Sequence, residues 1–214
     1  MSRIYIVFRQ LALNSCVLAN MLNQVFYISS VILMLSLGSH ALSTRISRGP
    51  CQANLTAVGD LNMRRYEGIW YPQFAYPLYH KSLPKCVKYN VTKDISGKYR
   101  ILRSDIDSQS GNVRRRSTLI LRVSRKGGKY AIRTDNSPDG LNMYVLDTDY
   151  RTYSIQYACI ELEGILNIAY AVIMTRERMP SSEVIQKTKQ LAELSGIDQK
   201  KMVPILQGAC PIDV

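Results

Sequence analysis

From Gly68 onward, short runs rich in Val, Ile, Tyr and Thr alternate with clusters of turn-forming residues. Runs of this length, bounded by Gly, Pro, Asn, Asp or Ser, are typical of strands in an antiparallel all-β domain. The pattern predicts eight strands, which cover residues 68–76, 86–93, 98–105, 115–124, 129–135, 141–148, 153–160 and 165–174.

The breaks between these runs hold residues that favour tight hairpins. The predicted turns are Ser96-Gly97, Ser110-Gly111-Asn112, Gly127-Gly128, Pro138-Asp139-Gly140 and Glu163-Gly164. Successive strands joined by short turns form a meander, and this spacing favours an up-and-down β-barrel.

One α-helix is predicted near the C-terminal end. Ser181 or Ser182 follows Pro180 and can cap its first turn, and Gly196 can end it. The less polar side chains of this stretch fall mostly on one side, so they need a surface to cover. They are Val184, Ile185, Thr188, Leu191, Ala192 and Leu194.

Residues 1–41 have the layout of a secretory signal peptide, with Arg3 and Arg9 ahead of an apolar run that ends before Ser39-His40-Ala41. The run, residues 25–37, is shorter than the ~20 apolar residues of a membrane-spanning helix. We therefore expect cleavage near Ala41 and secretion to the extracellular space. An uncleaved signal anchor and a start at Met21 are the alternatives.

The composition predicts one globular domain over residues 42–214, since the hydrophobic content of 46% and the mean hydropathy of -0.10 argue against disorder. The chain is basic, with a net charge of +12. Its basic residues, which could form one face for anionic glycans or membranes, are Arg64, Arg65, Arg114, Arg115, Arg116, Arg122, Arg125, Lys126 and Lys129. A solvated surface is the simpler interpretation, and no nucleic-acid-binding motif is present.

Four cysteines remain after the signal segment, namely Cys51, Cys86, Cys159 and Cys210, and this even number fits an oxidising compartment. They allow three pairings. Without CxxC or HxxxH spacing, no metal site is expected. His80 is the single histidine after residue 41, so no Ser/His/Asp arrangement is compelling and no enzyme is expected.

Two sequons, Asn54-Leu55-Thr56 and Asn90-Val91-Thr92, predict N-linked glycans on Asn54 and Asn90. A secreted chain would pass through the compartment in which such sites are used. The sequence does not determine their occupancy.

Three motifs occur in order along the chain: Gly68-Ile69-Trp70, Thr148-Asp149-Tyr150 and Met174-Thr175-Arg176. With the cysteines, they make the chain similar to the lipocalin family, in particular its apolipoprotein D and insect bilin-binding branch. The resemblance extends from about Cys51 to Cys210.

This resemblance implies an eight-stranded antiparallel up-and-down β-barrel with one C-terminal α-helix packed outside. It also implies disulfides from Cys51 to Cys159 and from Cys86 to Cys210. Its implied structural residues, in which Arg176 stacks on the indole and the others organise the closed end without touching ligand, are Gly68, Trp70, Thr148, Asp149, Tyr150 and Arg176. Lipocalin relatives that are enzymes use an unpaired thiol, which this pairing would not leave.

The motif strand departs from the family pattern at Pro72. The family usually continues this strand with an acidic residue, and a proline removes a donor from the strand ladder. An edge or a β-bulge is expected there.

Because side chains alternate faces along a strand, one residue of known direction fixes its neighbours. Cys86 and Cys159 must point outward to meet the terminal arms, and we also expect Asn167 and Arg122 to face outward. The residues then expected to face the interior and bind ligand are Val87, Tyr89, Val91, Leu119, Leu121, Ala158, Ile160, Ile168, Tyr170 and Val172. The strands around Tyr99 and Met143 remain ambiguous.

We therefore expect a secreted carrier that binds a small hydrophobic ligand, such as a fatty acid, sterol, retinoid or bilin, inside the barrel. No cofactor is expected beyond such a bound bilin or lipid. The alternatives are an interior filled by its own side chains and a binding module that acts through its basic face. The sequence determines neither the ligand nor the oligomeric state.

Overall fold

The computed structural model describes residues 46–77, 84–124, 126–134, 137–211 and 214. The expected signal segment, residues 1–41, lies outside the described residues, as do His80 and Arg125. Within the described parts of the chain, no helix has the length and apolar character needed to cross a bilayer.

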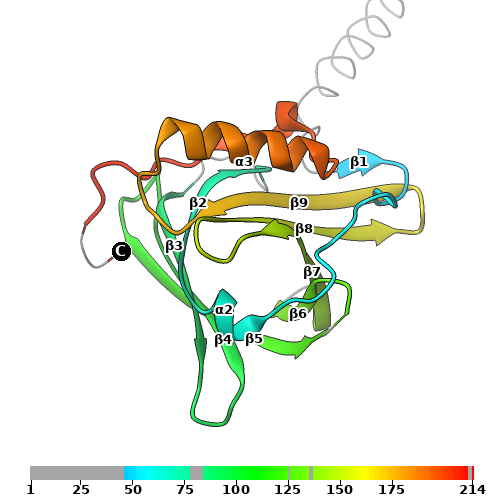
Figure 1. Ribbon diagram of the computed structural model, residues 1–214, viewed down its shortest axis with the longest axis horizontal. Helices are drawn as coiled ribbons and strands as arrows, with labels where there is room; N and C mark the ends of the chain where they lie inside the picture. Colours follow the sequence, from blue (N-terminus) through cyan, green and yellow to red (C-terminus); the bar gives the residue numbers. More distant parts are fainter. Residues whose placement is uncertain (1–45, 78–83, 125, 135–136, 212–213) are drawn as a thin grey trace, which may run out of the picture. The chain divides into compact units, whose positions relative to one another are not determined.

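Eight antiparallel strands form a closed ring, as the sequence predicts (Figure 1). Each strand pairs with the next along the chain, and the ring closes where the last strand pairs with the first. The strands are β2 (Gly68–Ala75), β3 (Lys85–Lys93), β4 (Tyr99–Ile106), β5 (Val113–Val123), β6 (Lys129–Thr134), β7 (Ser137–Thr148), β8 (Tyr153–Leu162) and β9 (Leu166–Thr175).

The structure adds short elements that the sequence pattern does not indicate. Strand β1 (Ile46–Arg48) pairs with β9, and β10 (Val203–Pro204) pairs with β2. A single helical turn, α2 (Met63–Tyr66), precedes β2, and a 3-10 turn, η1 (Gln199–Lys201), precedes β10. These elements are too short to show a hydrophobic period of their own.

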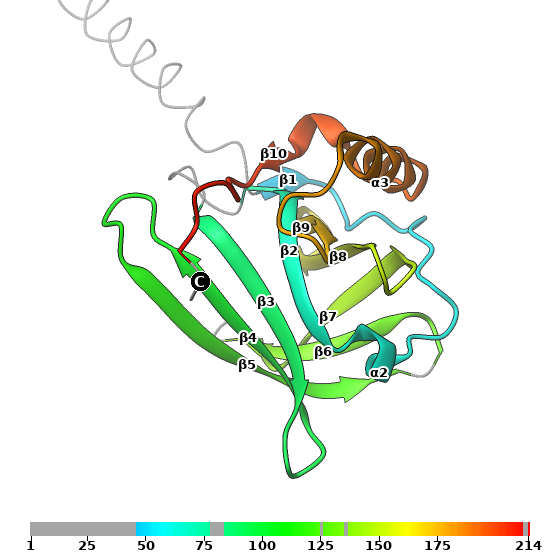
Figure 2. The ribbon, with the colours of Figure 1, turned by 60° about the vertical axis from the view of Figure 1, so that its left-hand side comes forward.

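We call the end of the barrel where β2 begins and β9 ends the base, and the opposite end, where β4 ends and β5 begins, the rim. Figure 2 shows α2 beside the base and the β4–β5 hairpin at the other end of the barrel. The antiparallel order fixes these ends, since alternate strands run in opposite directions.

Helix α3 (Ser182–Leu194) packs against β7, β8 and β9 on the outside of the barrel (Figure 1). Ser181 caps it by accepting a hydrogen bond from the Val184 N–H, as predicted. Thr188 and Ala192 are buried, whereas Leu194 is 84% exposed, so its assignment to the covered side was wrong. The chain turns at Gly196, and Ile197 enters the apolar layer under the helix instead.

The sheet separates two apolar layers. Ile155 and Ile173 belong to the outer layer under α3, whereas Ala158, Val172 and Met174 belong to the inner layer. The alternation along β8 and β9 thus buries both faces of these strands.

Both disulfides have the pairing that the family resemblance implies. Cys51 is bonded to Cys159 of β8, and Cys86 of β3 is bonded to Cys210. Each bond attaches one terminal arm to the outside of the barrel.

A β-bulge corrects the predicted orientation of β5. Its pairing with β6 shifts register between Ile120 and Arg122. Ile120 belongs to the inner layer and Thr118 lines the interior, so Leu119 and Leu121 do not face inward as expected. The extra residue of a bulge reverses the alternation, and the expectation was carried from Arg122 back across it.

Two proline positions have different outcomes. The pairing of β2 with β9 shifts register between Pro72 and Phe74, so the predicted irregularity at Pro72 is present. Pro138-Asp139-Gly140 was predicted to be a turn but lies within β7. Thr134 pairs with Ser137, so the chain reverses before the proline is reached.

Candidate functional site

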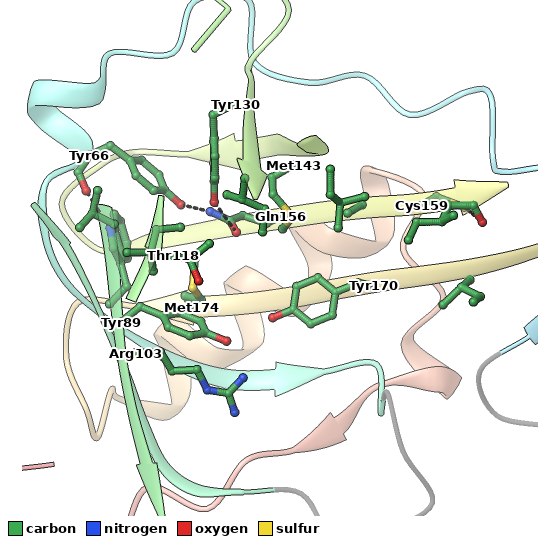
Figure 3. A pocket seen from close by; sticks show the side chains of 18 residues that line it. Tyr66, Tyr89, Arg103, Thr118, Tyr130, Met143, Gln156, Cys159, Tyr170 and Met174 are labelled. Atoms are coloured by element: carbon green, nitrogen blue, oxygen red, sulfur yellow. Dashed lines mark hydrogen bonds between the residues drawn. The ribbon is translucent and has the colours of Figure 1, made fainter. Parts of the chain in front are cut away.

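A cavity of about 390 Å³ lies inside the barrel. Most of its wall is apolar or aromatic, and Figure 3 shows side chains from several strands converging on it. Six of the predicted ligand-binding residues line it, namely Tyr89, Val91, Ala158, Ile160, Ile168 and Tyr170.

Two further predicted residues are buried beside the cavity rather than in its wall. Val87 is 1% exposed and Val172 is fully buried, and both belong to the inner apolar layer. Their inward direction is as expected, but they do not line the cavity. Leu119 and Leu121 do not line it either, for the reason given above.

The sequence did not identify the part of the wall that comes from β4, β5, β6 and β7. These strands contain no cysteine or sequon that would show which side chains face inward. Bulges also interrupt the alternation in β5 and β7. The residues missed there are Ile101, Arg103, Thr118, Tyr130, Ile132, Leu141 and Met143. Tyr66 of α2 was also missed, because a single helical turn gives no usable pattern.

Trp70 and Arg176 form the base of the barrel. The indole is fully buried, and the guanidinium carbon of Arg176 lies 3.7 Å from the centroid of the indole ring. The indole Nε1 donates a hydrogen bond to the Tyr66 carbonyl at 2.9 Å. Trp70 also lines the cavity, whereas the family resemblance implies that it does not touch the ligand.

Three carbonyl groups accept hydrogen bonds from Arg176. Its Nη1 donates to Ile69, its Nη2 to Arg65 and its Nε to Tyr150, at 2.9, 3.0 and 3.1 Å respectively. Gly68 has a φ of +96°, and a Cβ atom there would lie 3.1 Å from Arg176 Nη1. Glycine therefore fits both the backbone conformation and the close approach.

The loop between β7 and β8 is organised by Thr148 and Asp149. Thr148 Oγ1 donates to the Tyr153 carbonyl, and Asp149 Oδ1 accepts from the backbone N–H groups of Arg151, Thr152 and Tyr153. Burial alone would raise the pKa of Asp149, but these hydrogen bonds outweigh it and hold the pKa below its ordinary value. These hydrogen bonds thus order the β7–β8 loop next to the base of the barrel.

A series of hydrogen-bonded polar side chains forms part of the cavity wall near Trp70. Tyr130 Oη donates to Gln156 Oε1 at 3.1 Å, Gln156 Nε2 donates to Tyr66 Oη, and Tyr66 Oη lies 2.6 Å from Ser154 Oγ. Burial raises the pKa of both Tyr66 and Tyr130, so both hydroxyls stay protonated near neutral pH. Figure 3 shows Tyr66, Tyr130 and Gln156 on one side of the cavity.

Toward the rim, the wall carries Arg103, Tyr89 and Tyr170. The guanidinium carbon of Arg103 lies 5.9 Å from the centroid of the Tyr89 ring. Burial and the neighbouring Tyr89 raise the pKa of Tyr170 well above its ordinary value. Tyr89 and Tyr170 interact electrostatically with the guanidinium, and Figure 3 shows the three side chains on the same part of the wall.

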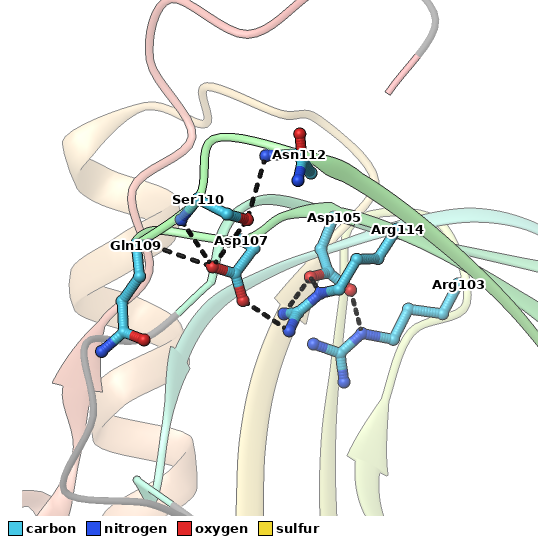
Figure 4. Close-up of polar contacts among 7 residues, drawn as sticks. All are labelled: Arg103, Asp105, Asp107, Gln109, Ser110, Asn112 and Arg114. Atoms are coloured by element: carbon cyan, nitrogen blue, oxygen red, sulfur yellow. Dashed lines mark hydrogen bonds and ion pairs between the residues drawn. The ribbon is translucent and has the colours of Figure 1, made fainter.

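Ion pairs connect Arg103 to the β4–β5 hairpin (Figure 4). Arg103 Nε donates to Asp105 Oδ1 at 2.8 Å, and Arg114 Nε donates to Asp105 Oδ2 at 2.9 Å. Arg114 Nη1 also donates to Asp107 Oδ2 at 2.7 Å, and Asp107 Oδ1 accepts from the backbone of Ser110. The hairpin turn is thereby fixed to the cavity wall.

The described basic residues that the sequence grouped together are divided between the two ends of the barrel. Arg64 and Arg65 belong to α2 at the base, whereas Arg114 and Arg116 lie at the beginning of β5 at the rim. Lys126 and Lys129, at the turn between β5 and β6, lie at the same end of the barrel as Arg64 and Arg65. A binding module that acts through a basic face stays a prediction.

Asn54 is exposed and Asn90 is half-buried on β3, and glycosylation of both remains a prediction. Among the described residues, no three or more His, Cys, Asp or Glu side chains are grouped so that they could hold a metal ion.

Comparison with known proteins adds a family match. Residues 88–209 match the model of the "Lipocalin / cytosolic fatty-acid binding protein family". Apolipoprotein D of Macaca fascicularis is 26% identical over 153 residues, which cover 71% of this chain and 80% of the relative. The crustacyanin-A1 subunit of Homarus gammarus is 25% identical over 154 residues, which cover 71% and 83% respectively.

Solved structures show the same fold. Insecticyanin from the tobacco hornworm Manduca sexta superposes with a TM-score of 0.64 at 19% identity, over 76% of this chain and 89% of that one. Apocrustacyanin C2 also gives a TM-score of 0.64, at 21% identity, over 80% of this chain and 97% of that one.

Proposed function

The chain belongs to the lipocalin / cytosolic fatty-acid binding protein family, and from this premise we propose that it is a secreted carrier of one small hydrophobic ligand. The ligand would occupy the barrel interior and leave chemically unchanged. A fatty acid, sterol, retinoid or bilin has suitable chemistry.

The cavity is the observation that supports this proposal. Its volume of about 390 Å³ lies within the ~300–1,000 Å³ typical of small-molecule sites. An interior filled by its own side chains would leave no such space. Burial of ~300 Å² of apolar ligand surface would contribute about 7 kcal/mol before ordering costs, which suits micromolar or tighter binding.

The chemistry of the wall supports carriage rather than turnover. Its polar groups are few, and Tyr66, Tyr130 and Gln156 already hydrogen-bond to one another. The disulfides engage Cys51, Cys86, Cys159 and Cys210, so these sulfur atoms are not thiol nucleophiles.

The two disulfides also support the proposal of secretion. Structural disulfides persist in oxidising compartments and are rare in the cytosol. N-terminal sequencing of the mature protein would test the expected cleavage near Ala41, and recovery of a chain that begins at Met1 would refute it.

Fluorescence of Trp70 offers a direct test of the carrier proposal, because the indole lines the cavity and is the single tryptophan. Titration with a fatty acid, a sterol, a retinoid and a bilin should give saturable quenching by at least one of them. The absence of saturable binding by every member of the panel would defeat the proposal.

A cavity-filling variant makes this test sharper. Ala158 is 1% exposed and lines the cavity, so Ala158→Phe should abolish binding while the barrel remains folded. Lys88→Phe, which adds the same ring to the outer face of β3, should bind like the wild type. If both variants bound the ligand with the wild-type affinity, the ligand would lie outside the barrel.

A further inference from the structure

Arg103 is the one charged side chain among the described residues that line the cavity. Its side chain is 30% exposed, so it is partly withdrawn from water. A guanidinium keeps its charge under these conditions, because its pKa lies far above neutral pH.

Among the described residues, one hydrogen bond engages one of the donors of Arg103. Its Nε donates to Asp105 Oδ1 at 2.8 Å, while within the described residues the Nη1 and Nη2 groups donate no hydrogen bond. Both Nη groups belong to a side chain of the cavity wall. Paired Nη donors match the two oxygens of a carboxylate.

Asp105 cannot turn to accept hydrogen bonds from these Nη groups. Its side chain is only 2% exposed, and its second oxygen, Oδ2, accepts from Arg114 Nε at 2.9 Å. The Asp105 carboxylate is thus shared between two arginines and fixed on both sides (Figure 4).

A third arginine adds positive charge beside this pair. Arg116 lies directly opposite Arg103 in the ladder between β4 and β5, so both start from the same face of the sheet. Arg114 lies opposite Asp105 on that face. Like charges in directly opposed positions destabilise a sheet, and an anion bound between them would relieve this repulsion.

Tyr89 and Tyr170 supply neutral donors at the same place. Both interact electrostatically with the Arg103 guanidinium, and Figure 3 shows their hydroxyls on the same part of the wall. A tyrosine hydroxyl is protonated near neutral pH and can donate to an anion, and burial raises the pKa of Tyr170 further.

We propose that Arg103, with Tyr89, Tyr170 and Arg116, binds the carboxylate of an amphipathic acid whose apolar part extends toward Trp70. This inference rests on the proposed function and narrows its ligand class to hydrophobic acids. It also assigns Arg116, which shares a sheet face with Arg103, to ligand binding rather than to an outer basic surface.

The test compares a fluorescent polyene fatty acid, cis-parinaric acid, with its methyl ester, because the two differ in charge and share the same chain. The wild type should bind the acid at least about tenfold more tightly, as expected for charge-assisted hydrogen bonds. Arg103→Gln should remove this preference and leave the affinity for the ester unchanged. Arg116→Gln should reduce the preference about two- to fivefold, since its charge is more exposed.

Arg115→Gln is the matched control, because it removes the same charge from the adjacent position of β5 on the opposite face. Its acid-to-ester ratio should equal that of the wild type. If Arg103→Gln fails to fold, Arg103→Lys serves instead, because it retains the charge without the paired donors. Its ratio of acid to ester affinity should fall between the wild-type ratio and 1.

Equal affinity of the wild type for acid and ester would overturn this inference and leave the carrier proposal standing. Binding of neither molecule, together with no binding of retinol or a sterol, would defeat the carrier proposal itself. Retinoic acid with retinol, and biliverdin with its dimethyl ester, repeat the comparison and distinguish which kind of hydrophobic acid fits the cavity.

Discussion

The guanidinium of Arg176 lies over the indole of Trp70, with 3.7 Å between the guanidinium carbon and the ring centroid. The two residues come from β2 and from the segment directly after β9, the strands whose pairing closes the ring. The stacked pair therefore joins the first and last strands of the barrel at the base. Its hydrogen bonds to three carbonyl groups extend this junction to α2 and to the β7–β8 loop.

Replacement of Arg176 should destabilise the barrel. Arg176→Gln removes a cation–π contact and charge-assisted hydrogen bonds to carbonyl groups, so we expect a loss of about 2 to 4 kcal/mol in the free energy of unfolding. Urea denaturation followed by circular dichroism measures this loss. Arg133→Gln, at an exposed position of β6, should change the value by no more than about 0.5 kcal/mol. Similar effects of the two variants would contradict the structural role of Arg176.

A pair of glycine variants should separate backbone strain from crowding. Gly68 and Gly111 both have positive φ values, +96° and +72°, but only the Cβ added at Gly68 would meet a neighbour, Arg176 Nη1. Gly111→Ala should therefore cost about 1 kcal/mol, from strain alone, and Gly68→Ala about 2 kcal/mol or more. Thermal unfolding of the two variants compares them, and an equal cost would show that the contact with Arg176 adds nothing.

Loss of a disulfide should cost more than most single substitutions. Cys86 and Cys210 are separated by 124 residues, and constraint of so long a loop in the unfolded chain stabilises the fold by roughly 3 to 5 kcal/mol. The double variant Cys86→Ser/Cys210→Ser should show this loss in urea denaturation. Reductant should bring the wild type to or below the stability of that variant, and a midpoint unaffected by reductant would contradict the prediction.

The stability of the protein should fall in acid partly through Asp149. Its folded-state pKa is held below the ordinary value of 3.8 by backbone hydrogen bonds, against the opposing effect of burial. A lowered folded-state pKa gives stability that is present above about pH 4 and is lost as the pH falls through the folded-state pKa. Asp149→Asn should therefore be less stable than the wild type at pH 7, and the difference should shrink below pH 4. A difference that does not vary with pH would refute this assignment.

Removal of the Tyr66 hydroxyl should leave buried polar groups without a partner. Tyr66→Phe takes a hydrogen-bond partner from Ser154 and from Gln156, which are fully buried and 4% exposed respectively. The expected cost is about 1 to 3 kcal/mol in the free energy of unfolding. Tyr71→Phe, at a half-buried position, should cost less, and the reverse order would count against the network.

The strands could be predicted well from the sequence because alternating runs and turn residues are local properties. The direction of side chains could be predicted only where a distant constraint fixed it. Cys86 and Cys159 gave the correct directions for β3 and β8, whereas a bulge after Ile120 reversed the expected direction in β5. A bulge depends on the pairing of two strands, so one strand's residues do not reveal it.

The chemistry of the cavity was largely hidden for the same reason. Arg103 lies on a strand whose direction the sequence left open, and its partner Asp105 is two positions along the same strand. Only the ladder between β4 and β5 shows that Arg114 and Arg116 share a face with them. The volume of the cavity likewise depends on how side chains from all eight strands pack together.

The two ends of the barrel are secured by different kinds of bond. Cys86 and Cys159 lie in the rim-side halves of their strands, whereas the base is closed by Arg176 and Trp70 without a covalent link. Conditions that break disulfides and conditions that weaken ion and hydrogen-bond contacts should therefore affect different ends of the protein. A reductant would release the two terminal arms from β3 and β8 and leave the Arg176–Trp70 pair intact, whereas acid would weaken the base through Asp149 with both arms still bonded.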